Sequence, residues 1–145
     1  YVLLDDKQEM DANKIEKYRL DPKRSVPYKR FYSLMYGLPM SINAFIKSFG
    51  ETQIVPFNKE SCYKLQIELK EPVITEHWNL YISLETKQLV GIEITDPEDD
   101  TKGERLLFND IMDYDGVNIP RIRHWYDYFT NRYGGSDIIL NKIAD

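Results

Sequence analysis

The chain has 145 residues but only one cysteine and two histidines. A single cysteine, Cys62, excludes an intramolecular disulfide and any cysteine-rich zinc site. His77 and His124 alone cannot build a histidine-rich metal site. We therefore expect neither a metal nor a cofactor. The segment around Cys62, KESC, also lacks the small and apolar residues of a lipid-attachment box, which favours an ordinary strand cysteine.

A long apolar run and a surplus of basic residues are missing as well. No apolar run approaches the roughly 18 residues that a membrane-spanning helix needs. The 19 Lys and Arg residues are scattered among 24 Asp and Glu residues, which gives a net charge of −5. This distribution offers no basic surface for a phosphate backbone, so the sequence argues against nucleic-acid binding.

No internal repeat, low-complexity tract or flexible linker divides the chain, so residues 1–145 are predicted to form a single domain. A chain of this length buries roughly 68 to 70% of its unfolded surface, which is enough for one core. The chain opens with YVLLDD, without Met or a signal peptide, and we interpret it as a processed or truncated product. The short run Val2–Leu4 is expected to be the remnant of an incomplete first strand with an exposed edge.

The segment RFYSLMYGLPMSINAFIKSFG shows the apolar period of helices. A first stripe ends near Gly37, and a second is expected to begin at Pro39 and stop at Gly50. The two stripes consist of Phe31, Leu34, Met35 and Leu38, then Ile42, Phe45, Ile46 and Phe49. The spacing therefore predicts two helices.

After Gly50 the apolar period drops to two, as in strands with one buried face. Short polar turns such as ETKQ and DYDGVN separate the alternating segments. Sequential strands joined by short turns predict an antiparallel meander, with the helices covering one of its faces. The predicted strands are 63–70, 78–84, 90–94, 105–112, 119–130 and 137–143.

The stretch from Asn109 to Phe129 gathers residue types common in active sites, yet a strand divides them between two faces. Ile122, His124, Tyr126 and Tyr128 share one face, and Arg121, Arg123, Trp125, Asp127 and Phe129 share the other. We expect His124 to be a hydrogen-bonded structural residue rather than a base or ligand, because no second ligand or nucleophile motif accompanies it.

Two acidic groups elsewhere are also expected to be structural. Glu68 and Lys70 match part of a metal-dependent nuclease pattern, but the remaining metal ligand and the basic surface are absent. Asp96 to Asp100, the DPEDD segment, lacks the glycine placement of a helix-loop-helix calcium site and is predicted to be a soluble hairpin loop. No catalytic residue is therefore expected, and the protein is predicted not to be an enzyme.

The apolar side chains of the helical segment leave two interpretations open. Phe31, Met35, Met40 and Phe45 would suit a pocket for an apolar ligand, since methionine is unbranched and adaptable. They would equally serve as plain core, because a sheet with one apolar face needs a helical cover.

Four segments in this order resemble the bacterial outer-membrane lipoprotein carriers: FYSLMYGLP, YKLQIELK, WNLYISLETKQLVGIEI and FNDIMDYDGVNIPRIRHWY. The chain is more closely similar to a carrier-related domain family of unknown function from Bacteroidetes-type bacteria. The shared marks are the helix pair near GLP, the turn around Thr86 and the hairpin at Tyr114, Gly116, Val117, Ile119 and Pro120. They extend from about Tyr32 onward.

This resemblance implies an α+β fold in which a curved antiparallel sheet, a half-barrel, is covered on its concave face by helices. It also implies export to the periplasm or outer membrane, and a missing N-terminal helix and strands. The implied function is non-enzymatic binding of a lipid or lipoprotein acyl chain in an apolar cavity. The alternative is an envelope interaction module with a filled core. The expected cavity residues are Phe31, Met35, Ile42, Phe45, Leu65, Ile67, Trp78, Leu80 and Ile82.

Overall fold

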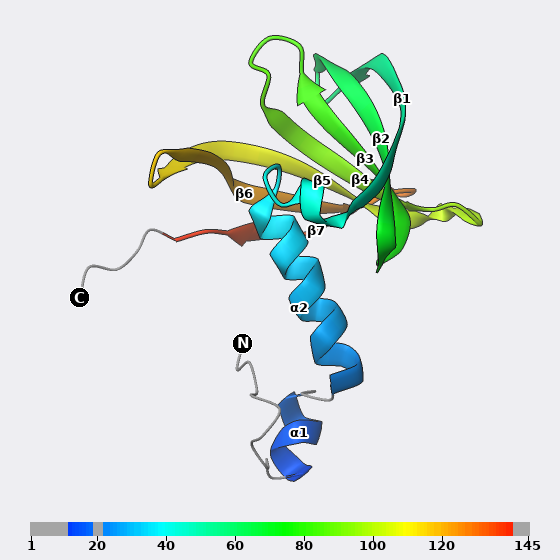
Figure 1. Ribbon diagram of the computed structural model, residues 1–145, viewed down its shortest axis with the longest axis vertical. Helices are drawn as coiled ribbons and strands as arrows, with labels where there is room; N and C mark the ends of the chain where they lie inside the picture. The colour runs from blue at the N-terminus through cyan, green and yellow to red at the C-terminus, as the bar shows by residue number, and fades with distance from the viewer. Residues whose placement is uncertain (1–11, 19–21, 141–145) are drawn as a thin grey trace.

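The computed structural model describes residues 12–18 and 22–140, which form three helices and seven strands. The helices are α1 (Ala12–Tyr18), α2 (Pro22–Gly37) and the single turn α3 (Ile42–Phe45). Helix α1 has no buried residue, and α2 projects from the sheet with only one end against it (Figure 1). Val2–Leu4, the expected first strand, lies outside the described residues.

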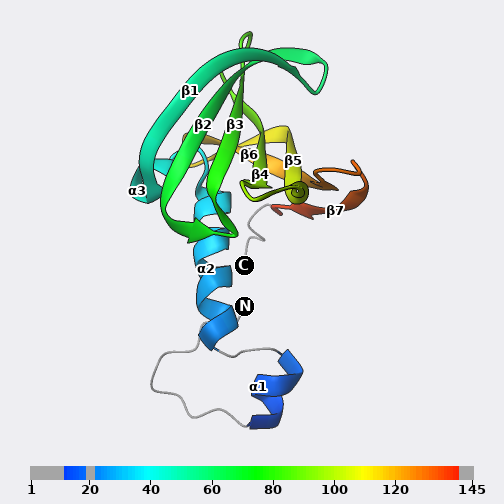
Figure 2. The ribbon, with the colours of Figure 1, turned by 90° about the vertical axis from the view of Figure 1, so that its right-hand side faces the viewer.

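All seven strands belong to one antiparallel sheet with the order β1-β2-β3-β4-β5-β6-β7, so each strand pairs with its neighbours in sequence. The sheet stays open and is not strongly curled; β1 crosses over the upper edge in Figure 2. The strands are β1 (Ile46–Phe57), β2 (Glu60–Val73), β3 (Thr75–Ser83), β4 (Leu89–Asp96), β5 (Asp99–Tyr114), β6 (Val117–Asp127) and β7 (Tyr133–Ile138).

The main core lies between one face of this sheet and the C-terminal half of α2. Leu34 and Met35 of this segment, and Leu38 just after it, are fully buried. They pack against alternate residues of the central strands, such as Ile92 in β4 and Leu106 in β5. Successive strand residues point to opposite faces of the sheet. The residues between these core positions therefore form a separate surface on the other face.

The second predicted helix, from Pro39 to Gly50, is present only as the single turn α3, from Ile42 to Phe45. The chain changes at Ile46 from α3 to β1, and Ile46 pairs with Leu69. Phe49, which completed the predicted apolar stripe, is 59% exposed, so the apparent helical period at this point reflects no buried face. Gly50, predicted as the helix stop, lies inside β1 and faces the Gln66 side chain. Pairing with β2 therefore overrides the local pattern.

The antiparallel meander and the first predicted helix are confirmed. The six strands predicted after Gly50 are present, although β2 and β5 are longer than their apolar alternation indicated. The last strand begins at Tyr133 and ends at Ile138, earlier than the predicted 137–143. The half-barrel is a finer description that stays a prediction.

Candidate functional site

The nine residues predicted to line an apolar cavity come together in one cluster, which we call the α2-sheet cluster. Six of them are buried core residues: Phe31, Met35, Ile42, Ile67, Trp78 and Leu80. Phe45, Leu65 and Ile82 are partly buried and pack against these six. They come from α2, α3, β2 and β3, so segments distant in sequence pack into one apolar core.

Helix α2 closes this cluster with only part of its length. Val26 and Tyr28, in its N-terminal half, are 62% and 56% exposed, whereas Leu34 and Met35 are fully buried. Figures 1 and 2 show the N-terminal half extending beyond the sheet. An ion pair between Arg30 and Glu71 of β2 marks where the contact begins. The helix is thus attached to the sheet along about two turns.

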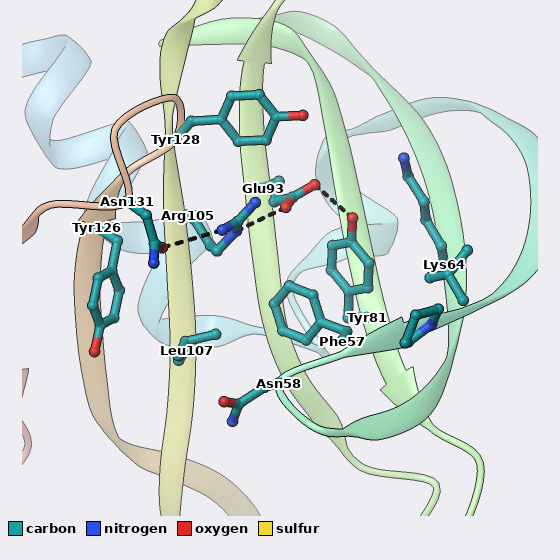
Figure 3. A pocket seen from close by; sticks show the side chains of 12 residues that line it. Phe57, Asn58, Lys64, Tyr81, Glu93, Arg105, Leu107, Tyr126, Tyr128 and Asn131 are labelled. Carbon is teal, nitrogen blue, oxygen red and sulfur yellow. Dashed lines mark hydrogen bonds and ion pairs between the residues drawn. The ribbon is translucent and has the colours of Figure 1, made fainter.

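A polar pocket with a volume of about 580 Å³ lies on the opposite face of the sheet (Figure 3). The end of β1 forms one wall, and the end of β6 with the segment after it forms the other. Tyr81 of β3, Glu93 of β4 and Arg105 of β5 form its floor. Its full lining is Val55, Pro56, Phe57, Asn58, Lys64, Tyr81, Glu93, Arg105, Leu107, Tyr126, Tyr128 and Asn131.

Glu93 lies at the centre of this floor and is only 4% exposed. It accepts hydrogen bonds from the Tyr81 hydroxyl at 2.5 Å and from Nε of Arg105 at 2.9 Å. Arg105 also donates to Oδ1 of Asn131 at 3.2 Å. Burial, followed by the contact with Glu93, raises the pKa of Tyr81 well above its ordinary value. A buried carboxylate with two donors is an ion-paired structural group rather than a free base.

An aromatic stack covers one side of the pocket floor. The Phe57 ring lies parallel to the Tyr81 ring, with centroids 3.8 Å apart. Gly91 of β4 lies beneath this stack, and a Cβ at that position would come within 2.5 Å of the Phe57 ring and the Leu106 carbonyl oxygen. Glycine is therefore required for this close approach.

Arg123 of β6 is a second buried charge, on the same face as the α2-sheet cluster. Its side chain is completely buried, and its three guanidinium nitrogens have no hydrogen-bond partner among the described residues. The guanidinium lies 4.6 Å from the Tyr36 ring centroid and 5.7 Å from that of Phe108. Burial lowers the pKa of Arg123, although Tyr36 and Asp137 oppose this shift.

The surroundings of Arg123 compensate its burial only in part. Each contact with an aromatic face contributes about 0.5 to 2 kcal/mol, whereas burying an unpaired ion costs on the order of several kcal/mol. Asp137 faces Arg123 across the β6-β7 pairing, but its Oδ2 accepts a hydrogen bond from Nε1 of Trp125 at 2.8 Å. In the described part of the chain, no ion pair joins Asp137 to Arg123.

His124 has the structural hydrogen bond that the sequence analysis expected. Its Nδ1 lies 2.6 Å from Oγ of Ser136 on β7, and its ring is close to Tyr133. The predicted division of β6 is also present, because Trp125 packs on the α2-sheet cluster while Tyr126 lines the polar pocket. The suspected site is thus split between two faces.

The other suspected groups have structural partners as well. Glu68 accepts from Lys47 at 2.6 Å and Ser48 at 2.9 Å, while Lys70 donates to the Ala44 carbonyl. Hydrogen bonding by Lys47 and Ser48 lowers the pKa of Glu68. In the β4-β5 turn, Asp96 accepts from the Glu98 amide. Cys62 is buried in β2, and its burial raises the thiol pKa.

Within residues 12–18 and 22–140, no three His, Cys, Asp or Glu side chains are grouped closely enough to hold a metal ion. The same residues include no helix long and apolar enough to cross a membrane. A second depression, of about 370 Å³, is lined by ten residues of β1 to β4 and the turn after β4. No residue of α2 lines either pocket.

Comparison of the chain with protein-family models, with curated proteins and with solved structures finds no match in any of the three.

Neither the polar pocket nor the burial of the Arg123 charge was predicted from the sequence. A signal for the pocket was present, since Glu93 interrupts the apolar run of β4 and lies directly opposite Arg105 in the β4-β5 pairing. Arg123 was placed correctly on the same strand face as Trp125, but alternation alone does not show that this face is covered by a helix. The burial of its charge is visible only in three dimensions.

Proposed function

We propose that the protein is a non-enzymatic binding protein of the cell envelope that accepts a lipid or lipoprotein acyl chain between α2 and the sheet. The observation that carries this proposal is the α2-sheet cluster, in which all nine predicted residues belong to one apolar core between the helices and the sheet. Its location in the periplasm or outer membrane, and a half-barrel curvature of the sheet, rest on the resemblance to the lipoprotein carriers.

Binding requires α2 to rise from the sheet, because Met35 and Leu38 fill the space in the structure described here. Its attachment through one half favours such a movement, since Val26 and Tyr28 in the N-terminal half are exposed and that half extends beyond the sheet. A chain inserted between helix and sheet keeps both apolar surfaces covered. Burying about 14 carbons supplies on the order of 10 kcal/mol before ordering costs, so micromolar affinity is expected.

The test uses the two tryptophans of the chain as reporters, because Trp78 belongs to the α2-sheet cluster and Trp125 packs against it. Titration with a saturated fatty acid should change their fluorescence in a saturable manner at micromolar concentrations. Ile82→Asn, at the partly buried edge of the cluster, should weaken binding about tenfold, because it places an amide against the acyl chain.

Ile54→Asn is the matched control, since Ile54 is 65% exposed on β1 and should leave the affinity unchanged. The absence of any saturable change, with native mass spectrometry showing no lipid bound, would rule out the proposed function.

The second candidate is an envelope interaction module with a filled core. The specific observation in its favour is the complete burial of Leu34 and Met35 on α2 and of Leu38 just after it. In this alternative α2 is a permanent part of the core, and partners bind elsewhere on the surface. The polar pocket would then be the first surface to examine.

A further inference from the structure

We propose that Arg123 binds the anionic head group of an amphiphile whose acyl chain occupies the α2-sheet cluster. This inference rests on the proposed function. It specifies the ligand as an acyl chain that carries one carboxylate or phosphate group. An acyl chain with a neutral head group would leave the buried charge of Arg123 unpaired.

The position of Arg123 supports this assignment. Arg123 pairs with Phe108 across β5 and β6, and Phe108 is itself a member of the cluster. Trp125 lies two residues further along on the same face of β6 and packs against that cluster. The centroids of the Trp125 and Phe31 rings are 5.8 Å apart. The guanidinium therefore lies at the border of the apolar surface, where the head group of a bound chain would lie.

The unused hydrogen-bonding capacity of Arg123 selects the chemistry of the head group. A guanidinium carries five N–H donors in a planar fork that matches two oxygens of a carboxylate or phosphate. All three nitrogens of Arg123 lack a partner among the described residues. Asp137, which faces Arg123 across β6 and β7, accepts from Trp125 and forms no ion pair with Arg123. A bound anion would satisfy donors for which the described residues supply no partner.

The movement of α2 that admits the acyl chain also uncovers Arg123. Tyr36, on the last turn of α2, lies over the guanidinium, and the neighbouring Leu34 and Met35 cover the cluster. When α2 rises, the ring moves away from Arg123 and the apolar surface is uncovered at the same time. The head group then replaces an aromatic face, which interacts more weakly with a guanidinium than a bidentate anion does.

The test compares dodecanoic acid, dodecanol and inorganic phosphate by tryptophan fluorescence of the wild-type chain. We expect the acid to bind about 10- to 100-fold more tightly than the alcohol, because a hydrogen-bonded charge pair is formed only by the acid. Phosphate alone is expected to bind much more weakly, because it buries no chain. Equal affinities for acid and alcohol would overturn the inference, and phosphate binding as tightly as the acid would overturn the amphiphile as ligand.

Arg123→Gln should remove the preference for the acid and leave the alcohol affinity within about threefold. Arg121→Gln is the matched control, because Arg121 lies two residues away on β6 and already has partners in Asp110 and the Ile139 carbonyl. It should retain the preference. A preference retained in folded Arg123→Gln would contradict the role of Arg123. If neither acid nor alcohol binds the wild-type chain, the proposed function itself fails, an outcome distinct from equal binding of both.

Discussion

Glu93 and Arg123 are buried charges with opposite surroundings. Glu93 has two donors at hydrogen-bonding distance, so its negative charge is compensated within the polar pocket. Arg123 has two aromatic faces but no hydrogen-bond partner in the described part of the chain. A compensated charge stabilises one arrangement of the strands, whereas an uncompensated one favours a state in which a partner is bound.

We expect Tyr81→Phe to lower the free energy of unfolding by about 1.5 to 3 kcal/mol, because it removes one of the two donors to a buried carboxylate. Denaturant unfolding measures this loss. Tyr126→Phe serves as the control, since its ring lines the same pocket while its hydroxyl points away from Glu93 (Figure 3). Equal stability of the two variants would show that the hydrogen bond to Glu93 contributes nothing.

The individual residues of the α2-sheet cluster were easier to predict from the sequence than those of the polar pocket. Apolar residues at strand and helix spacing, such as Met35 and Leu80, follow directly from periodicity. Glu93 and Arg105 are opposite each other only after the β4-β5 register is known. Tyr126 lies opposite Arg105 only once the β5-β6 register is known, and Asn131 joins them through the turn after β6, which no short-range pattern reports.

Among the elements, α2 combines two surroundings in one helix. Met35, near its end, is fully buried, while Met40, just after it, is 50% exposed. Pro27 lies inside the helix, and Gly37 ends it with a turn in which the Ser41 hydroxyl donates to the Leu34 carbonyl. The packing of the last two turns on the sheet therefore holds α2 in place.

We expect Met35→Ala to lower the free energy of unfolding by about 2 to 5 kcal/mol, because it leaves a cavity in the α2-sheet cluster. Met40→Ala is chemically the same change at an exposed position and should alter stability by no more than about 0.5 kcal/mol. Thermal and denaturant unfolding compare the two variants. Similar values for both would mean that α2 does not pack on the sheet in solution.

In the β4-β5 hairpin, hydrogen bonding lowers the pKa of the Asp99 carboxyl group. Hydrogen bonds from Lys102 and then from Thr101 hold the pKa of Asp99 at about 2, below its ordinary 3.8. The ionised Asp99 therefore stabilises the hairpin above about pH 4, and this contribution is lost as the pH falls through about 2.

Asp99→Asn should consequently reduce the fall in Tm between about pH 5 and about pH 2.5, because the variant has no carboxylate to protonate there. Asp115→Asn, in the β5-β6 turn, is the control, as Asp115 forms no ion pair in the described part of the chain. Its Tm should fall as in the wild type. A wild-type pH dependence in Asp99→Asn would show that Asp99 contributes nothing to acid stability.

The element order was largely predictable, and its one clear error has a physical cause. Alternation identifies β2 and β3 because each has one buried face. The edge strand β1 is exposed along most of its length, so it lacks the apolar pattern that identifies a strand. Its N-terminal residues Ile46 and Phe49 instead continue the spacing of the preceding helical segment. Only the pairing with β2 reveals the strand.

For the whole molecule, the sheet separates two surfaces of different character. One face carries the α2-sheet cluster with Arg123 at its border, and the other carries the polar pocket around Glu93. Acyl-chain binding requires the first face to open, whereas an interaction module would leave it closed. The two proposals therefore differ in where a bound lipid would be found.

The most direct test of the acyl-chain proposal is photo-crosslinking with a fatty acid that carries a diazirine in its chain, followed by mapping of the adducts by mass spectrometry. The proposal predicts adducts in the C-terminal half of α2 and on the cluster residues of β2 and β3, such as Leu65 and Ile82, and competition by unlabelled fatty acid. Adducts confined to the polar pocket, at Tyr126 or Tyr128, or no competed adduct at all, would contradict it.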